Sequence, residues 1–431
     1  MRILVLGGNG FIGAHLAAHL ISEGHDVTVG VRSTGRAGGW SGEALVFDFA
    51  APPSVDELAT RLDGFDAVVN CVGALQDGFG ERLEDVHIRG LEVLLAACAR
   101  HPEIRLVHIS AIGVDPEGAT GFARTKAVGE ALIRASETDW VILRPGLAIA
   151  RAVHGGTAAI RGLAGLPGIL PVFGARTENI GIVAMPDLVR IVAACLDGPE
   201  VAGQVIDVVG RERVSIATLA AKIRFWLGFP RPRFVFVPDS LLARVLRLGD
   251  FAGRLGWRHP LRTTSFVQLA AGLEGRSEEA ERLNGGPLQS LDRFLAGQPA
   301  SVQDRRHARL FFLKPLAIVV LGLFWIASGL ITLLPGRTLA HEMLTESLMP
   351  GAIVPIVLYG GGLLDLAIGA GLLFRPTFPP TLKLSFWVSL GYLLAGTLFA
   401  PTYWNDPLGA YLKVLPILVL TVILEAMGEE R

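Results

Sequence analysis

The sequence predicts an α/β fold, a doubly wound parallel sheet with a small α+β lobe, followed by a four-helix transmembrane bundle. The sheet is predicted by residues 2 to 145, where short apolar runs alternate with amphipathic stretches, a rhythm typical of parallel strands joined by right-handed helical crossovers. The bundle is predicted by charge, because 66 of the first 310 residues are charged but only 13 of the last 121. A chain of 431 residues also exceeds the size of one hydrophobic core, so we expect separate domains.

Six strands with helices between them are expected in the first 145 residues. The strand-like runs are Ile3–Leu6, Val27–Val31, Ala44–Phe47, Ala67–Val72, Leu106–Ser110 and Val141–Leu143. The helical stretches between them include Ile12–Glu23, Asp85–Arg100 and Thr125–Thr138.

The pattern after Pro145 is looser and is expected to form the lobe. Helices are predicted at Pro186–Cys195 and Ser215–Leu227, and a strand at Gln204–Val209. The stretch Gly155–Gly174 is rich in glycine and proline, which predicts loops around a site. The segment Arg231–Arg262 interleaves arginines with apolar residues. We expect it either to lie on lipid headgroups or to pack on the lobe as ordinary helices.

Four apolar stretches follow a polar, basic connector at residues 301–311. They are Phe312–Leu334, Ala352–Phe374, Leu382–Ala400 and Leu408–Ala426. Each approaches the roughly 20 residues that a helix needs to cross the hydrocarbon core of a bilayer. Four buried helices of a soluble domain are the alternative, and the sustained low charge of this region disfavours it.

Basic residues gather on one side of the predicted spans. The connector and the loop after the second stretch hold Arg305, Arg306, Arg309, Lys314, Arg375 and Lys383, whereas the first loop holds only Arg337 and the third none. The positive-inside rule then places both ends of the chain in the cytoplasm. We therefore expect an integral membrane protein of the bacterial inner-membrane type, with four spans and with residues 1–310 and the carboxyl terminus cytoplasmic.

The overall charge and the cysteine content exclude several classes of protein. The formal net charge is −1, so no basic field is available to hold nucleic acid. The three cysteines, Cys71, Cys98 and Cys195, lie far apart and lack the spacing of a zinc site or a disulfide framework. We expect no metal site and no nucleic-acid partner.

A glycine motif follows the first predicted strand. Residues 7 to 13 read Gly-Gly-Asn-Gly-Phe-Ile-Gly, and a helix is expected to begin near Phe11. Gly7, Gly10 and Gly13 permit a tight turn and let the backbone approach a pyrophosphate. Phe11 and Ile12 open a helix whose amide groups and positive dipole end favour phosphate. Strand, motif and helix in this order predict a Rossmann-type dinucleotide-binding domain.

The end of the second predicted strand indicates which nicotinamide cofactor is bound. A carboxylate that contacts the ribose of NAD normally stands here, about 20 residues after the motif. This chain has Arg32 instead, with Arg36 close by. Because an arginine can pair with a 2′-phosphate, we expect NADP(H) in preference to NAD(H). A solvated loop arginine is the alternative.

These features resemble the short-chain dehydrogenase/reductase superfamily, in its extended and atypical branches, over most of residues 1 to 225. The resemblance implies adenine contact by Asp48, and ribose and phosphate contact by Asn70, Val72 and Gly73. Two further stretches stand where the family has its serine strand end and its LRP segment, Ile109-Ser110-Ala111 and Leu143-Arg144-Pro145-Gly146. The stretches Asn70–Ala74 and Gly121–Glu130 most resemble the branch near the cofactor-binding accessory subunit of respiratory complex I.

The chain departs from this family at the catalytic tyrosine. Active members pair a tyrosine with a lysine four residues later, and the matching positions here are Phe122 and Lys126. The four tyrosines of the chain all lie in the membrane segment. Two interpretations stay open. Either Lys126 and Ser110 still serve as catalytic residues, helped by His87 or His154, or Lys126 holds only the nicotinamide ribose and the cofactor is structural or sensed.

The apolar tail resembles the DoxX-like membrane family, small four-helix proteins linked with redox and quinone chemistry. The resemblance covers residues 312–427 and rests on the number of spans, the glycine content and the stretch Gly360–Asp365. Asp365 lies about nine residues into the second span, or ~14 Å deep. A carboxylate at that depth should face the bundle interior, and Tyr392 is its expected partner. The pair is either a polar lock or a proton or quinone site.

The sequence thus predicts an NAD(P)-binding domain over residues 1–300, with a core at 1–145 and a substrate lobe at 145–300, then a basic linker at 301–311 and a membrane domain at 312–427. As an enzyme, the protein is expected to be an oxidoreductase acting on an apolar, membrane-borne acceptor, a quinone or a lipid carbonyl. The alternative is a non-catalytic nucleotide-binding sensor or scaffold of a membrane complex, because Phe122 replaces the tyrosine. The expected partners are the lipid bilayer, the acceptor and a membrane protein.

Overall fold

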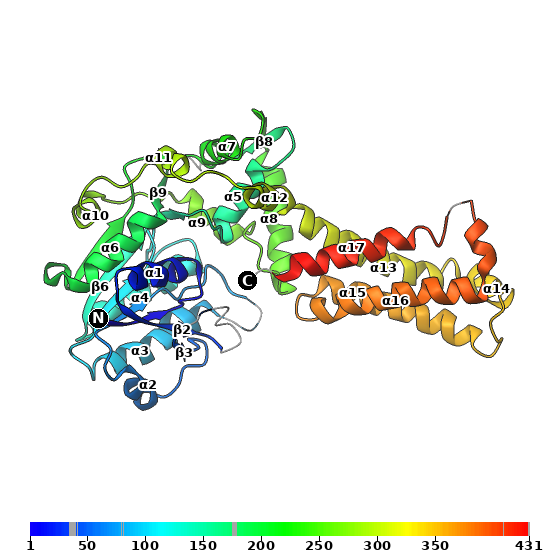
Figure 1. The fold of residues 1–431 in the computed structure, drawn as a ribbon, viewed down its shortest axis with the longest axis horizontal. Coiled ribbons are helices and arrows are strands. Elements are labelled where there is room, and N and C mark those ends of the chain that lie inside the picture. The colour runs from blue at the N-terminus through cyan, green and yellow to red at the C-terminus, as the bar shows by residue number, and fades with distance from the viewer. Residues whose placement is uncertain are drawn as a thin grey trace. The chain divides into compact units, whose positions relative to one another are not determined.

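The computed structural model of the chain contains two compact units (Figure 1). The first comprises residues 1–251 and 259–308, and the second comprises residues 252–258 and 309–431. The structure describes residues 1–33, 40, 42–78, 80, 82–174, 179–407 and 409–429. Each unit is described by itself.

A seven-stranded parallel sheet forms the centre of the first unit. Its strands are β1 (Arg2–Leu6), β2 (Asp26–Val31), β3 (Ala44–Val46), β4 (Ala67–Asn70), β5 (Arg105–Ile109), β6 (Asp139–Pro145) and β10 (Gln204–Val208). The strand order is β10-β6-β5-β4-β1-β2-β3, and all neighbouring pairs are parallel. The predicted α/β class is therefore confirmed. The seventh strand, β10, comes from the part of the chain after Pro145 and pairs with β6.

Helices cover both faces of this sheet, as a doubly wound fold requires. On one face α1 (Phe11–Ser22) and α6 (Met185–Asp197) share a core with Ile3 and Val5 of β1. On the other face Leu4 and Leu6 pack with three helices, α2 (Val55–Leu62), α3 (Gly90–Cys98) and α4 (Gly121–Ala135). Because successive side chains of a strand point to opposite faces, a strand buried on both faces must be apolar throughout. A π-helical turn, Asp85–Arg89, precedes α3.

The lobe is built from two small sheets and several helices. One sheet has the order β11-β9-β7 and the other pairs β12 with β8. These strands are β7 (Leu147–Ile149), β8 (Ile169–Val172), β9 (Ile180–Ala184), β11 (Arg213–Val214) and β12 (Arg233–Phe236). The helices are α5 (Gly155–Ala164), α7 (Ile216–Trp226), α8 (Asp239–Arg254), α9 (Thr263–Ala270), α10 (Glu278–Leu283) and α11 (Leu291–Ala296).

The prediction of loops at Gly155–Gly174 is wrong, because this stretch contains α5 and β8. The Thr157 hydroxyl donates to the carbonyl oxygen of His154 at 2.9 Å and accepts from its amide at 3.1 Å, which fixes the first turn of α5. Every residue from Thr157 to Ala164 is buried. A Cβ on Gly165 would lie 2.3 Å from the carbonyl oxygen of Ala308. The small residues here permit close packing and not loop flexibility.

The segment expected as a basic linker forms a helix, α12 (Val302–Leu310). Its buried carboxylate, Asp304, pairs with Arg161 at 3.0 Å and Arg151 at 3.4 Å. The amide and hydroxyl of Ser301 also donate to Asp304, both at 2.7 Å. These contacts hold the start of α12 on the lobe.

The second unit contains three helices that are long and apolar enough to cross a membrane, among the residues that the structure describes. They are α13 (Leu313–Leu333), the continuous helix Ile356–Leu373, which ends as α15 (Gly361–Leu373), and α16 (Phe378–Phe399). The fourth expected stretch contains α17 (Val414–Ala426), an apolar helix of 13 residues. A short helix, α14 (Arg337–Thr345), follows α13. The count of four spans stays a prediction.

The helices of the second unit pack as a bundle (Figure 1). α13 contacts α15 and α17, and α16 contacts the same two helices. Glycines bring α13 and α15 close together. A Cβ on Gly329 would lie 2.5 Å from the carbonyl oxygen of Gly362, and a Cβ on Gly369 would lie 2.7 Å from that of Gly322. Small residues of this kind are typical of helix contacts in membranes.

Candidate functional site

The glycine motif forms a tight turn between β1 and α1. Gly7 has a φ of 74°, which favours glycine. Its amide and that of Gly8 donate to the carbonyl oxygen of Gly30 at 3.0 and 3.2 Å. A Cβ on Gly13 would lie 2.2 Å from the carbonyl oxygen of Gly7, so no other residue fits there. The N-cap residue of α1 is Gly10, which has no side chain with which to cap the helix, and a helix start of this kind can bind an anion.

The turn after β4 lies against this glycine turn. A Cβ on Gly7 would lie 3.2 Å from both the carbonyl carbon of Cys71 and a methyl carbon of Val72. In the sheet the chain runs from β1 toward β3 on one side and from β4 toward β10 on the other. The boundary between β1 and β4 is therefore a topological switch point, where such sheets bind ligands.

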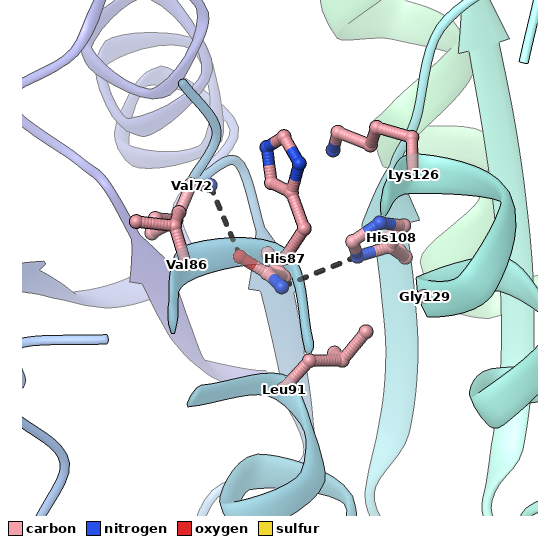
Figure 2. A pocket seen from close by; sticks show the side chains of 8 residues that line it. Val72, Val86, His87, Leu91, His108, Lys126 and Gly129 are labelled. Atoms are coloured by element: carbon pink, nitrogen blue, oxygen red, sulfur yellow. Dashed lines mark hydrogen bonds between the residues drawn. The ribbon is translucent and has the colours of Figure 1, made fainter. Parts of the chain in front are cut away.

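Asn70 shapes the turn after β4. Its side chain is buried, and its Oδ1 accepts from the amide of Val72 at 3.0 Å. Its Nδ2 lies 3.2 Å from Nδ1 of His108 on β5 (Figure 2). Because an amide NH₂ can only donate, Nδ1 of His108 accepts this hydrogen bond. Burial and the positive charge of Lys126 hold the pKa of His108 well below its usual range. Asn70 and His108 are thus a neutral pair that supports the turn.

The residues expected at the adenine end are spread over two strand ends. Arg32 is exposed just after β2, while Arg36 lies outside the described residues. Asp48 is half-buried after β3, and its Oδ1 accepts from the amide of Ala50 at 3.0 Å. Asp48 therefore stabilises its own turn and retains a second carboxylate oxygen.

Lys126 is buried at the inner end of the site. Its Nζ donates to the carbonyl oxygen of Ile109 at 2.9 Å. A Cβ on Gly73 would lie 3.6 Å from this Nζ, so the lysine reaches the turn after β4. Burial lowers the pKa of Lys126 to about 8, although the negative charge of Glu130 opposes the shift. The ammonium group can therefore lose a proton near neutral pH.

His87 and Lys126 extend toward each other across a small pocket (Figure 2). Nε2 of His87 accepts from the amide of Ala74 at 3.2 Å, and Nδ1 lies 2.8 Å from the hydroxyl of Thr125. Since a backbone amide can only donate, the ring proton is on Nδ1. Burial and the charge of Lys126 lower the pKa of His87 to about 2. His87 is neutral, and its one proton faces Thr125.

Phe122, at the position of the family tyrosine, packs edge-on against His87 with ring centroids 5.7 Å apart. The pocket between the described residues around His87 and Lys126 has no room for a water-sized sphere. An apolar ring thus stands where the resemblance implies a tyrosine hydroxyl.

Ser110 is hydrogen-bonded into a buried ion network. Its hydroxyl donates to Oε1 of Glu130 at 2.6 Å. Glu130 also accepts two hydrogen bonds from Arg144, at 2.8 and 2.5 Å, and one from Arg134 at 2.8 Å. A hydroxyl has a single proton, so in this arrangement Ser110 offers an approaching carbonyl only its lone pairs. The sequence analysis missed Glu130, although its place one helical turn after Lys126 could have signalled a charge partner.

The glycine motif also contacts the lobe. The ring of Phe11 stacks on that of His154, with centroids 6.2 Å apart and an interplanar angle of 18°. His154 is the residue before α5. This contact fixes the first residue of α1 against the lobe, and it uses one face of the His154 ring.

The structure brings Asp365 and Tyr392 together in the second unit. The Tyr392 hydroxyl donates to Oδ1 of Asp365 at 2.9 Å, and the Ser328 hydroxyl donates to Oδ2 at 2.7 Å. Asp365 is buried. Its carboxyl group thus joins α13, α15 and α16 by hydrogen bonds to both oxygens. Over the described part of the chain, no group of three or more His, Cys, Asp or Glu side chains is placed to hold a metal ion.

Two family matches cover the two parts of the chain. Residues 7–161 match the NAD(P)H-binding family, and residues 322–422 match the DoxX-like family. Among curated proteins, the chain is similar to the 40 kDa subunit of mitochondrial NADH-ubiquinone oxidoreductase from Neurospora crassa, with 28% identity over 148 residues, covering 33% of this chain and 39% of that subunit. It is also similar to the ceramide reductase of Caulobacter vibrioides, with 26% identity over 202 residues, covering 45% of this chain and 60% of that reductase. The chain thus spans 39% and 60% of the lengths of these two relatives, less than two thirds of each.

Solved structures with the same fold include sugar-nucleotide epimerases. UDP-glucuronic acid 4-epimerase from Bacillus cereus, in complex with UDP-glucuronic acid and NAD, has a TM-score of 0.52 and 20% identity, covering 72% of this chain and 100% of that chain. A nucleoside-diphosphate-sugar epimerase from Staphylococcus aureus has a TM-score of 0.53 and 17% identity, covering 68% of this chain and 99% of that chain. At such identities the likeness shows the fold alone.

The fold, the glycine turn and these matches define a Rossmann-type NAD(P)H-binding domain, with short-chain dehydrogenase/reductase and epimerase structures among its structural neighbours. The expected resemblances are confirmed. The protein is an oxidoreductase-like NAD(P)H-binding domain joined to a DoxX-like region, and it is an integral membrane protein.

Proposed function

We propose that this protein is an NADPH-dependent oxidoreductase that reduces an apolar acceptor held in the membrane, a quinone or a lipid carbonyl. The observation that carries the proposal is the position of Lys126. Its buried ammonium group lies beside Gly73, at the turn that meets the glycine motif, and its pKa is lowered to about 8. An ammonium group with this pKa can donate the proton that a reduced acceptor takes up, which supports the proposal.

The glycine turn fits a dinucleotide, because Gly13 admits no Cβ and the N-cap residue of α1 is Gly10, which has no side chain. Gly7, Gly10, Phe11, Ile12 and Gly13 would hold the pyrophosphate. Further contacts would come from Asp48, Asn70, Val72, Gly73 and Lys126, with Arg32 and Arg36 recognising the 2′-phosphate of NADPH. When bound, the cofactor supplies a hydride to the acceptor.

Lys126 would donate the proton that the reduced oxygen takes up. An ammonium group has three N–H donors, and the hydrogen bond to Ile109 uses one of them and orients the group. Ser110 would contribute by fixing the end of β5 through Glu130, because its own proton is already donated. The neutral His87 would hold Ala74 and Thr125 in place, and Phe122 would exclude water.

The membrane region supports an acceptor that dissolves in lipid. A fused membrane domain confines the cofactor site to the two-dimensional pool in which quinones and lipid carbonyls are found. The printed names of two relatives, a ceramide reductase and an NADH-ubiquinone oxidoreductase subunit, include substrates of this kind. These names motivate the choice of acceptors to test.

The test is NADPH oxidation by the full chain in lipid nanodiscs that contain either a quinone or a long-chain ketone. We expect turnover with one of these classes, lost in Lys126→Ala and in Gly10→Ala, where a Cβ would lie 3.0 Å from the carbonyl oxygen of Gly7. Lys222→Ala is the matched control, because Lys222 is in the lobe and pairs with Glu212 and Asp292. Absence of NADPH oxidation with both classes of acceptor would contradict the proposal.

A second candidate is a non-catalytic nucleotide-binding subunit that senses the cofactor or helps to assemble a membrane complex. The contacts of Phe122 and Ser110 favour it, because neither side chain offers a proton to a substrate. The complex I subunits among the relatives are consistent with it. This candidate predicts nucleotide that purifies with the chain in a one-to-one ratio and leaves slowly, together with a co-purifying membrane protein.

We also propose four spans, with residues 1–310 and the carboxyl terminus in the cytoplasm, and domain limits at 1–300 and 312–427. One contact supports an even number of crossings. Nζ of Lys314, at the start of α13, donates to the carbonyl oxygen of Met427, just after α17, at 2.6 Å. Membrane-impermeant labelling of cysteines placed at residues 305 and 428 tests this arrangement. Labelling of both from the same side is expected, and labelling from opposite sides would contradict it.

A further inference from the structure

Helix α8 exposes an apolar stripe. Leu241, Val245, Leu248 and Phe251 are 48%, 40%, 68% and 58% exposed. Their spacing of three and four residues places them along one side of the helix. Leu242 and Leu246 are buried and form the side that packs on the protein. The exposed stripe is therefore a second apolar face, separate from the one that holds the helix in place.

Arginines border this stripe. Arg244 and Arg247 are exposed, and at 3.6 residues per turn both lie on the flank of the stripe away from Leu242 and Leu246. Arg254 continues the same flank at the end of the helix. Asp250, the acidic residue in the second half of α8, is half-buried and accepts from the hydroxyl of Thr263 at 2.6 Å. The flank is thus positively charged.

Residues 252–258, which follow Phe251, belong to the second unit, the one that contains the apolar helices. Nε1 of Trp257 donates to the carbonyl oxygen of Leu373 at 2.7 Å, and its ring packs edge-on against Phe378, with centroids 5.2 Å apart. The guanidinium of Arg375 lies over the same ring, and its amide donates to Leu255. Leu373 ends α15 and Phe378 begins α16, so Trp257 and Arg375 mark the end of two apolar helices. Tryptophan and arginine at such ends are typical of the membrane–water interface.

The segment just before α8 also exposes apolar side chains beside arginines. Strand β12 is exposed along its whole length, with Phe234 at 56% and Phe236 at 66%. Arg231 and Arg233 are exposed beside them. Two arginines are thus followed directly by two aromatic rings in this short segment. Because an interfacial segment buries rings at the acyl boundary and keeps arginines among phosphates, this composition fits a lipid surface.

We propose that α8, together with β12, is an interfacial element that inserts Leu241, Val245 and Leu248 at the boundary between the headgroups and the acyl chains of an anionic bilayer. Two observations select lipid over a second copy of this chain. The arginine flank is complementary to anionic phosphate, and covalent continuity brings the end of α8 to the residues that pack at the ends of α15 and α16. The proposal is independent of the catalytic function proposed above.

The test uses the full chain in nanodiscs with an environment-sensitive fluorophore on Leu248→Cys. Brominated phospholipids quench fluorophores that lie among their acyl chains. Val128→Cys on α4 is the matched control, because Val128 is an exposed apolar residue of the nucleotide-binding core. The signal of the parent chain, whose Cys98 and Cys195 are buried, is subtracted. We expect strong quenching at residue 248 and none at 128.

Two results would overturn the proposal. Equal quenching at the two positions would show that residue 248 does not contact lipid. A blue-shifted emission at 248 without bromine quenching would show that protein, such as a second copy, covers the stripe.

The role of the arginines is tested in bilayers with and without anionic lipid. In the parent chain we expect quenching at residue 248 to increase when anionic lipid is added, and we expect Arg244→Gln/Arg247→Gln to lower it by at least about twofold. Arg82→Gln/Arg100→Gln is the control pair, because both arginines are exposed in the nucleotide-binding core. The same response in all three chains would contradict the proposed role of charge.

Discussion

The ammonium nitrogen of Lys126 lies 2.9 Å from the carbonyl oxygen of Ile109, the residue before Ser110. This contact joins the two residues expected to carry catalysis and gives them different roles. Lys126 keeps protons to donate, whereas the proton of Ser110 is given to Glu130. Phe122 stands where the resemblance implies a tyrosine, and the proposed function assigns the proton of that tyrosine to Lys126.

Replacement of Lys126 by arginine separates binding from proton transfer. Lys126→Arg retains the positive charge and hydrogen-bond donors, but a guanidinium does not release its proton at ordinary pH. We expect NADPH affinity within about tenfold of the parent and an oxidation rate at least about 100-fold lower. Fluorescence titration and nanodisc turnover measure the two quantities. Equal losses of affinity and of rate would assign Lys126 to binding alone.

Replacement of His87 changes the dependence of stability on pH. The pKa of His87 is about 2 in the folded chain and about 6.5 when unfolded, so below pH 6.5 the unfolded state binds a proton that the folded state does not. Stability therefore falls with decreasing pH, by about 1.4 kcal/mol per unit for each such histidine. His87→Gln should reduce this slope. Thermal unfolding of the detergent-solubilised chain at several pH values measures it. An unchanged slope would show that His87 is charged in the folded protein.

Replacement of Arg32 tests the preference for NADP(H). Loss of an arginine–phosphate contact weakens binding by about 1.5 to 3 kcal/mol, or roughly 10- to 100-fold. Arg32→Ala should weaken NADPH binding by this factor and leave NADH binding unchanged. Fluorescence titration of the parent and variant chains with NADPH and with NADH measures both affinities, and Arg100→Ala serves as the surface control. A parent chain that binds NADH as tightly as NADPH would refute the preference.

Replacement of Gly13 tests the glycine turn. The Cβ of Gly13→Ala would lie 2.2 Å from the carbonyl oxygen of Gly7, so the turn must open. We expect loss of nucleotide binding and a lower unfolding temperature. Gly156→Ala in α5 is the control, since its Cβ meets no described atom within 4 Å and alanine favours a helix. Nucleotide binding by Gly13→Ala at parental affinity would place the cofactor elsewhere.

Replacement of Asp365 tests its hydrogen bonds with Ser328 and Tyr392 inside the second unit. Asp365→Asn keeps an acceptor oxygen for one of the two hydroxyls and can donate its NH₂ to the oxygen of the other, whereas Asp365→Leu removes the partner of both the Ser328 and the Tyr392 hydroxyl. A polar lock predicts a stable, active Asn variant and a Leu variant that unfolds at lower temperature. A stable Asn variant without turnover would instead assign the carboxyl group to proton or quinone chemistry.

The fold of the core could be predicted because its signals are local. The apolar runs at Ile3–Leu6 and Ala67–Val72 and the glycines between Gly7 and Gly13 each specify an element without reference to distant residues. The lobe was harder to predict. Gly165 looks like a loop residue in the sequence, but its small size is needed for contact with Ala308, which follows 143 residues later.

The same limit applies to the site. Lys126 and Asn70 can be predicted from the sequence, because the stretches around them resemble those of a known family. The hydrogen-bond partners of the site residues cannot be predicted in this way. The contacts of Ser110 with Glu130 and of His87 with Ala74 and Thr125 depend on side-chain orientation. Sequence patterns identify residues that can donate a proton, but the direction in which each proton is donated emerges only from the packed structure.

The most direct test of the central claim is the pH dependence of NADPH oxidation by the full chain in quinone-containing nanodiscs. If the ammonium form of Lys126 supplies the proton, its pKa of about 8 predicts a constant rate below that value and a fall of about tenfold per pH unit above it. A rate that stays constant as the pH rises well above 8, or the absence of oxidation at any pH, would contradict the account.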